Sequence, residues 1–290
     1  MVAISVILAN LEKGDIKIVR AVYSLQSGKV TTTSIALMIQ LTEAPLHPQK
    51  WYGGSVFLFF ICFAVLGRAH VYGQNDGLVF TPEVIAGQAL IDARAAYNAD
   101  DETWVYRNHI QYSFSDSFNL RGVVQYRIDS SNRWDFRYVR FEGLWQFLED
   151  ETAGWDSALR FELEIAEGDD LPSRVRLAWS GSFDINECLQ VRGNVLTGYR
   201  IGPDSEPGVL LEVRAQVNRR ITRKVRVALD YFGNMNDTET LVNWESQRHQ
   251  IGPTLGIKLS KNVQVGGGVL FGISPAAANH EYRAIVMRTF

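Results

Sequence analysis

The chain has 290 residues, of which 46% are hydrophobic and 21% are charged, and its formal net charge is -3. This balance is typical of one large folded domain or two small ones, and it argues against nucleic-acid binding, which favours basic proteins. The two cysteines, Cys62 and Cys188, do not lie in motifs that bind zinc or haem or carry dithiol redox chemistry. Proline is scarce, at 8 residues, which suits continuous strands because proline removes a hydrogen-bond donor from a β-ladder.

The most apolar run of the chain, Ser55–Leu66, has the composition of an export signal. It is too short for a comfortable helical span of a membrane, which needs roughly 20 residues. Lys50 precedes the run, and the small residues Gly67 and Ala69 follow it. A basic residue, an apolar run and a small-residue cleavage site, in this order, are typical of a secretory signal peptide.

The position of this run predicts three regions in the chain. We interpret residues 50–73 as a signal peptide and residues 74–290 as the exported domain. A signal peptide belongs at an N-terminus, so we interpret residues 1–49 as an upstream extension or as the result of a start site assigned too far upstream. Two alternatives stay open, a short membrane anchor at residues 54–72 and a buried core helix or strand at Ser55–Leu66.

From Gly87 to the C-terminus, apolar and polar residues alternate, which is typical of strands with two different faces. The parity of Arg133–Leu148 changes near Tyr138–Val139, which predicts a β-bulge there. Most segments are close to the roughly 9–11 residues that a tilted strand needs to cross a bilayer. The pattern predicts about twelve strands, at Gly87–Asn98, Thr103–Phe114, Phe118–Ile128, Arg133–Leu148, Trp155–Ile165, Arg174–Phe183, Leu189–Arg200, Val209–Asn218, Lys224–Tyr231, His249–Ser260, Asn262–Ser274 and Glu281–Phe290.

The connections between these strands alternate in length. Short turns are expected at Ser115–Ser117, Asp184–Glu187, Arg219–Thr222 and Ser260–Asn262. Longer polar loops are expected at Asp129–Asn132, Glu167–Pro172, Ile201–Pro207, Asn234–Ser246 and Pro275–His280. Short turns at one end and longer loops at the other are typical of an outer-membrane β-barrel.

The two faces of the strands differ in a way that favours a membrane over water. Aromatic residues lie near strand ends, where lipid would meet water, at Trp104, Tyr106, Phe114, Phe118, Tyr126, Trp134, Phe136, Trp155, Tyr199 and Tyr231. The opposite face is rich in arginine and acidic residues, which a closed barrel can hold around water. Closure also removes the sheet edges that hydrocarbon does not tolerate. We therefore expect an all-β fold, an antiparallel transmembrane up-and-down β-barrel of about 12 strands, with a secreted soluble β-sandwich as the alternative.

The C-terminal stretch from Tyr282 to Phe290 resembles the last strand of outer-membrane proteins of Gram-negative bacteria. That strand ends in an aromatic residue preceded by apolar residues at alternate positions. Phe290, Val286, Ala284 and Tyr282 match it, whereas Arg288 departs from it. The resemblance covers most of the exported domain as a pattern, and it implies a small porin-like barrel in the outer membrane. It also implies contact with outer-membrane lipids and recognition of Phe290, Val286 and Tyr282 by the barrel-assembly machinery.

The polar face supplies the residues that we expect to line the lumen. They are Arg107, His109, Arg121, Arg127, Arg160, Glu162, Arg176, Arg192, Glu212, Arg214 and Arg226. An arginine-rich lumen would favour the passage of anions, and the alternative is a charge network that fills a small barrel and holds it rigid. We expect porin-like passage of small solutes, with a non-conducting structural or interaction barrel as the second hypothesis.

Catalytic and metal chemistry have weaker support. No serine stands near His109 in the spacing of lipid-hydrolysing barrels, so an outer-membrane hydrolase is the least favoured alternative. His249 and His280 have acidic residues nearby in the sequence, but isolated histidines carry little metal specificity. We predict no catalytic residues, no metal site and no cofactor.

Overall fold

The computed structural model describes residues 77–167, 171–202, 205–239, 241 and 243–290, and the backbone of residues 2–12 and 15–25. The chain divides into two compact units, Met1–Phe59 and Phe60–Phe290. In the first unit, β1 (Val2–Glu12) and β2 (Asp15–Leu25) pair as antiparallel strands. The signal peptide predicted at residues 50–73 lies outside the described residues. Within the described part of the chain, no helix is long and apolar enough to cross a membrane.

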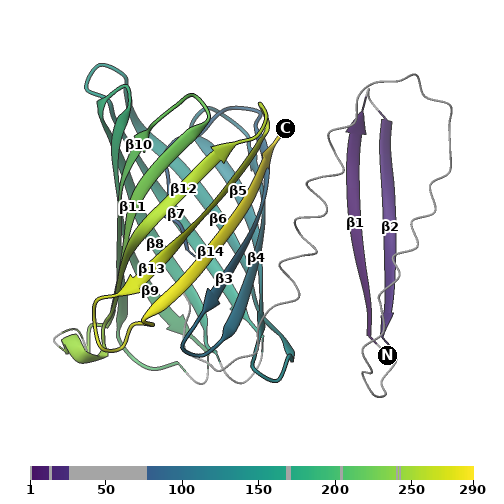
Figure 1. Cartoon of the computed structure of the whole chain (residues 1–290), viewed down its shortest axis with the longest axis vertical. Coiled ribbons are helices and arrows are strands. Elements are labelled where there is room, and N and C mark those ends of the chain that lie inside the picture. Colours follow the sequence, from purple (N-terminus) through teal and green to yellow (C-terminus); the bar gives the residue numbers. More distant parts are fainter. Residues whose placement is uncertain are drawn as a thin grey trace. The chain divides into compact units, whose positions relative to one another are not determined.

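The second unit contains a closed barrel of 12 antiparallel strands, as the sequence predicted (Figure 1). Each strand pairs with its neighbour in the chain, and the last strand pairs with the first, so no described strand of the barrel has a free edge. The strands are β3 (Ala89–Asn98), β4 (Thr103–Ser113), β5 (Phe118–Ile128), β6 (Trp134–Asp150), β7 (Trp155–Ala166), β8 (Ser173–Asn186), β9 (Leu189–Ile201), β10 (Val209–Arg220), β11 (Val225–Asp237), β12 (Arg248–Lys258), β13 (Val263–Gly272) and β14 (His280–Thr289).

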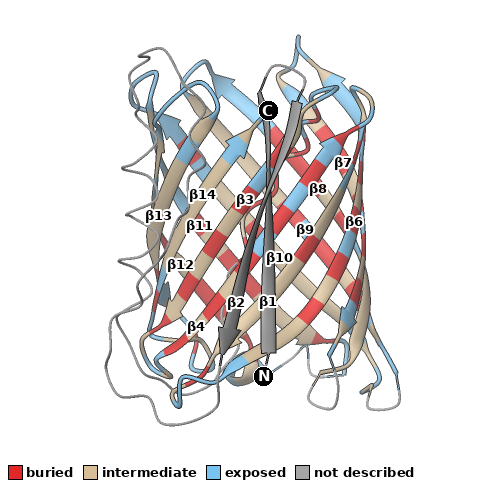
Figure 2. Cartoon of the chain, turned by 90° about the vertical axis from the view of Figure 1, so that its right-hand side faces the viewer, coloured by how far each residue is buried: buried red, intermediate tan, exposed pale blue. Residues whose placement is uncertain are grey.

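Burial alternates along the strands, because successive side chains point to opposite faces of a sheet (Figure 2). In β4, every second residue from Thr103 to Ser113 is buried, and these side chains point into the barrel. The outward positions carry large apolar side chains at high exposure, such as Ile110 at 64% and Phe141 at 56%. A wall of this kind is stable in lipid, where the exposed apolar side chains are not in contact with water.

Aromatic side chains form two groups on the outer face of the barrel. Trp104 stacks on Tyr106, and Tyr106 stacks on Trp134, with ring centroids 5.9 Å and 5.8 Å apart. At the other ends of the same strands, Tyr112 packs edge-on against Phe114 at 4.9 Å. Interfacial girdles of this kind are expected at the two boundaries between lipid and water, and they agree with the aromatic positions predicted from the sequence.

The two ends of the barrel differ in their connections. At the turn end, which also holds the start of β3 and the C-terminus, residues 114–117, 151–154, 187–188, 221–224 and 259–262 join the strands. This is the upper end in Figure 1. At the loop end, the connections are residues 99–102, 129–133, 167–172, 202–208, 238–247 and 273–279, and one of them contains the short 3-10 helix η1 (Trp244–Ser246).

The strand bounds correct several details of the sequence prediction. β8 continues through Asp184 to Asn186, where a turn was predicted to begin at Asp184. β11 continues to Asp237, where a loop was predicted to begin at Asn234. The cause is that the polar residues at these positions still pair with neighbouring strands, as Asp184 does with Gln190. The predicted bulge in β6 is confirmed, since the register between β5 and β6 shifts beside Tyr138.

Candidate functional site

The inner wall formed by β6, β7 and β8 carries a dense cluster of ionised side chains. Register places Glu162 opposite Glu142 on one side and opposite Arg176 on the other. We call the resulting cluster the charge network; it consists of Arg140, Glu142, Arg160, Glu162, Glu164, Arg174 and Arg176.

Ion pairs connect the charge network across the strands. A guanidinium nitrogen of Arg176 lies 2.5 Å from a Glu162 oxygen, and one of Arg140 lies 2.6 Å from a Glu164 oxygen. The Glu162 side chain is 0% exposed. A buried charge is tolerated only when it is paired, so each member of the network depends on its neighbours.

The other predicted lumen residues lie around this network. Arg121 contacts Glu142 at 3.5 Å, and Arg127 contacts Asp135 at 3.3 Å. Glu212 accepts a hydrogen bond from Arg214 at 2.7 Å. The Arg107 guanidinium lies 5.8 Å from the centre of the Tyr138 ring.

Arg192 and Arg226 differ from these residues in their surroundings. Arg192 donates a hydrogen bond to the Gln190 side chain at 2.7 Å. In the described part of the chain, no carboxylate lies within ion-pair distance of Arg192 or Arg226, and Arg226 is exposed. Neither arginine therefore has the close carboxylate partner that the arginines of the charge network have.

His109 is buried in the inner wall beside Asp92, with 3.8 Å between its Nε2 and a carboxylate oxygen. Neither ring nitrogen has a hydrogen-bond partner among the described residues. This arrangement lacks the hydrogen bond between a histidine and a nucleophile that covalent catalysis requires. No group of three acidic, histidine or cysteine side chains in the described part of the chain is placed to hold a metal ion.

The residues before β3 lie inside the barrel, a position that no pattern in the sequence predicted. We call residues 77–84 the lumen segment. Val79, Phe80 and Val84 are buried against side chains of the inner wall. The segment makes hydrogen bonds with wall side chains from four strands, which include Asn194 of β9 and Gln146 of β6. The sequence feature that could have indicated this position is composition: five residues of the segment are hydrophobic or glycine, and they do not alternate with polar residues as in a strand.

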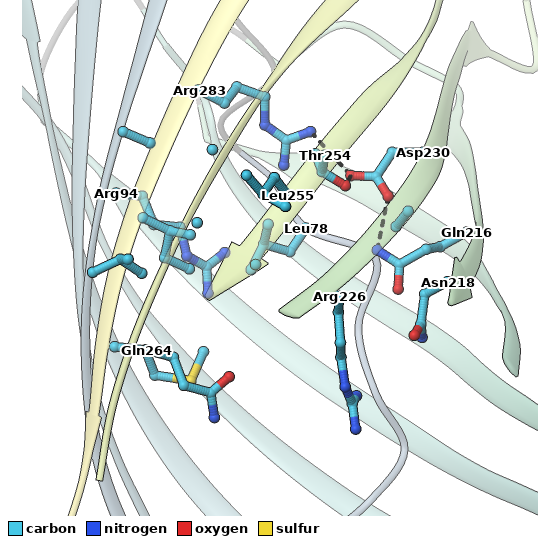
Figure 3. A pocket seen from close by; sticks show the side chains of 18 of the residues that line it. Leu78, Arg94, Gln216, Asn218, Arg226, Asp230, Thr254, Leu255, Gln264 and Arg283 are labelled. Atoms are coloured by element: carbon cyan, nitrogen blue, oxygen red, sulfur yellow. Dashed lines mark hydrogen bonds and ion pairs between the residues drawn. The ribbon is translucent and has the colours of Figure 1, made fainter. Parts of the chain in front are cut away.

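A cavity of about 230 Å³ lies beside the lumen segment, against β9 to β14 and β3 (Figure 3). Arg192, Arg226 and Arg283 line it together with Asp230 and Leu78. Asp230 accepts a hydrogen bond from Gln216 at 2.7 Å and lies 3.7 Å from Arg283. The cavity wall therefore carries more positive than negative groups.

Several inner-wall residues were absent from the sequence prediction. Arg140 and Glu142 follow the bulge in β6, where the alternation changes parity, so their face was ambiguous. Asp230 and Arg283 are central to the cavity, but they lie on different strands, and only the closed register brings them together. Asn194 binds the backbone of Phe80, and nothing in the sequence pairs these two residues.

Two of the predicted assembly residues, Tyr282 and Val286, lie on the outer face of β14, and Phe290 follows the end of this strand. Tyr282 and Phe290 are about half exposed. β14 closes the barrel by pairing with β13 and β3. A role for these residues in assembly stays a prediction.

A closed 12-stranded barrel with an apolar outer face, aromatic girdles and a polar interior defines an outer-membrane β-barrel protein of the porin-like class. No protein-family model and no curated protein sequence matches the chain. Solved structures with the same fold agree with the class and with an outer-membrane location. At the low identities found, the likeness concerns the fold.

Three of these structures are similar over the whole barrel. The KdgM porin has 13% identity and a TM-score of 0.52, over 69% of this chain and 99% of that chain. The NanC porin has 11% identity and a TM-score of 0.52, over 68% of this chain and 98% of that chain. The COG4313 outer membrane channel from Pseudomonas putida F1 has 9% identity and a TM-score of 0.57, over 75% of this chain and 100% of that chain.

Proposed function

We propose that the protein passes small solutes through the outer membrane and favours anions. The observation that carries this proposal is the cavity on the β9–β14 side. Its wall includes Arg192 and Arg226, and no carboxylate of the described residues lies in ion-pair distance of either arginine. Rings and clusters of arginine in a pore attract anions. The likeness in fold to porins and outer-membrane channels supports passage of solutes as the class of function.

The charge network does not serve the same purpose. In the network each guanidinium faces a carboxylate, so the field of the pair falls off quickly and attracts no anion from a distance. Arg192 and Arg226 have no such carboxylate at ion-pair distance among the described residues, so their positive charge is neutralised less. The preference for anions therefore depends on Arg192 and Arg226 rather than on the total number of arginines.

Ion selectivity in planar bilayers tests this proposal. The full chain is inserted between two concentrations of potassium chloride, and the reversal potential is measured for the wild type and for Arg192→Glu and Arg226→Glu. We expect each change to shift the reversal potential towards cation preference, because an anion then meets a negative group in the cavity. Arg219→Glu is the matched control, since Arg219 lies near the same turn end on the outer face and is exposed.

Two results would contradict the proposal. A reversal potential that moves equally in Arg219→Glu and Arg192→Glu would show that the cavity has no special part in selectivity. Complete absence of current from correctly folded barrels would favour the non-conducting structural or interaction barrel instead. Correct folding is checked by the shift in gel mobility between boiled and unboiled samples.

A further inference from the structure

We infer that the lumen segment, Gly77–Val84, is a plug that the inner wall binds as it would bind a peptide ligand, and that its release opens the solute path. This inference rests on the proposed passage of solutes. It assigns a peptide-binding surface to the inner wall, and it names residues 77–84 of the same chain as the occupant.

Wall side chains bind the backbone of the segment directly. The Asn194 amide makes two bonds with Phe80, accepting from its backbone N–H at 2.7 Å and donating to its carbonyl at 3.1 Å. The Val84 N–H donates to the Gln146 side chain at 2.8 Å. Arg214 donates to the Leu78 carbonyl at 2.8 Å, and Arg283 donates to the Gly77 carbonyl. Extended backbone away from any ladder needs such partners, and here four strands supply them.

The wall also offers three apolar contacts to the segment. Val79 packs on Phe232 and Leu270, Phe80 packs on Ala178 and Leu196, and Val84 packs on Leu144 and Ala158. The interior of an outer-membrane barrel is ordinarily polar. Inner-face leucine and phenylalanine at these positions are therefore explained by the segment that covers them.

The Phe80 side chain anchors the segment on the charged wall. The Arg160 guanidinium lies 3.6 Å from the centre of the Phe80 ring, and the Arg214 guanidinium lies 4.7 Å from it. Cations stacked on an aromatic face are attracted to it, more so when water is excluded. Phe80 thus covers part of the charge network and joins the segment to it.

The successive residues of the segment contact strands on different sides of the barrel, so the segment crosses the lumen. Val84 contacts β6 and β7, Phe80 contacts β7 to β10, and Gly77 contacts β14. In the closed order, β6 and β14 are separated by intervening strands on both sides. Gln146 lies near the turn end of β6, whereas Arg283 lies well inside β14, so the segment goes deeper into the barrel as it crosses. Leu78 then reaches the cavity of Figure 3.

The form of attachment makes release feasible without unfolding the barrel. The segment is held by side chains and is not a strand of the sheet, so its departure breaks no ladder. Gly87 joins it to β3 with φ at +71°, a conformation that glycine adopts easily. Water that enters after release can solvate Arg160 and Arg214, which reduces the cost of uncovering them.

A reversible covalent tether tests the plug. In the full chain with Cys62 and Cys188 changed to serine, Val84→Cys and Ala158→Cys place two thiols in one buried contact. We expect an oxidant to join them and to lower the bilayer current at least tenfold, and a reductant to restore it. The matched control is Val84→Cys without the second cysteine, which should conduct equally under both conditions.

A second variant tests release without a tether. Asn194→Ala removes both bonds to Phe80 and should increase the fraction of time that the channel is open, with an unchanged gel shift as the check on folding. A current that is the same in the oxidised, reduced and Asn194→Ala channels would overturn the plug and leave solute passage standing. Failure of the thiols to join in the folded barrel would also overturn it. No current in any variant would remove solute passage itself.

Discussion

The inner wall of the barrel has two sides that differ in the size of their inward side chains. On β6, β7 and β8, the inward positions carry long charged side chains that pair with one another and support the lumen segment. On β12 and β13, the inward positions include Gly256 and Gly266, which line the cavity. A lumen can thus be closed on one side and open on the other without any change in the surrounding sheet, because the size of each inward side chain determines how much of the lumen is filled.

Breaking the charged side should have the largest effect on stability. Glu162→Gln removes the carboxylate that faces Arg176 at 2.5 Å and Arg140 at 3.5 Å. Arg176 then keeps only carboxylates at 3.9 Å and 4.0 Å, so its buried charge is compensated far less. We expect the free energy of unfolding to fall by about 3–5 kcal/mol. Urea titration of the folded barrel in lipid vesicles measures it.

The control for this change is an ion pair at the surface. Glu206→Gln alters the contact of Glu206 with Arg200, where the Glu206 side chain is 76% exposed. It should change the free energy of unfolding by less than about 1 kcal/mol. Equal losses in both variants would mean that burial of the charge network has no part in its stability.

Filling the open side should act on conductance instead. A β-carbon added to Gly256 meets no atom within 4 Å, and Gly256 lines the cavity. Gly256→Trp should therefore reduce single-channel conductance several-fold with little change in folding. Gly193→Trp is the matched control, since Gly193 also has free space around it but lies at an outward position of β9. Equal conductance in the two variants would exclude the cavity from the solute path.

The smallest effect is expected from an ion pair in a loop that adjoins the charged side. The Asp129 carboxylate accepts bonds from Arg133, whose side chain is 78% exposed, and from the Ser131 N–H. Partial burial raises the pKa of Asp129, but hydrogen bonds from Arg133 and Ser131 outweigh it and hold the pKa below its ordinary value.

A group with a lowered pKa in the folded state stabilises that state at neutral pH, and this contribution is lost as the pH falls through the folded pKa. Asp129→Asn should therefore cost less than about 1 kcal/mol near neutral pH, and nothing once the wild-type carboxyl is protonated. Urea midpoints at neutral and acidic pH measure the difference. If the difference in urea midpoint between the wild type and Asp129→Asn grew at acidic pH, the stabilising role of the Asp129 carboxylate would be contradicted.

The fold could be predicted from the sequence because its signal is local. Alternation within a strand such as Thr103–Phe114 needs no knowledge of its neighbours, and twelve such segments imply a closed wall. The state of each arginine could not be predicted in the same way. Arg176 has a carboxylate partner and Arg226 has none among the described residues. Which arginine is paired depends on the register of adjacent strands, which alternation alone leaves open.

The position of the lumen segment could not be predicted from the sequence either, because it depends on contacts between distant residues. Phe80 has no periodic pattern around it, and its partner Asn194 lies on β9, the seventh strand after it in the chain. Side-chain bonds to a backbone group leave no trace in the sequence of the bound segment. Polar and apolar inner-wall residues such as Asn194 and Leu196 acquire their meaning only once the barrel closes.

The ladder between β12 and β13 contains a weak point with its own consequence. Pairing runs through Ile251 and Phe271 and resumes at Thr254 and Gly268, while Pro253, which has no N–H to donate, stands between. Between these positions, fewer hydrogen bonds join β12 to β13 than elsewhere in that pair of strands, and we call this place the seam. Mechanical or thermal opening of the wall should begin at this seam, and amide protons beside it should exchange with solvent deuterium sooner than those of β7 and β8.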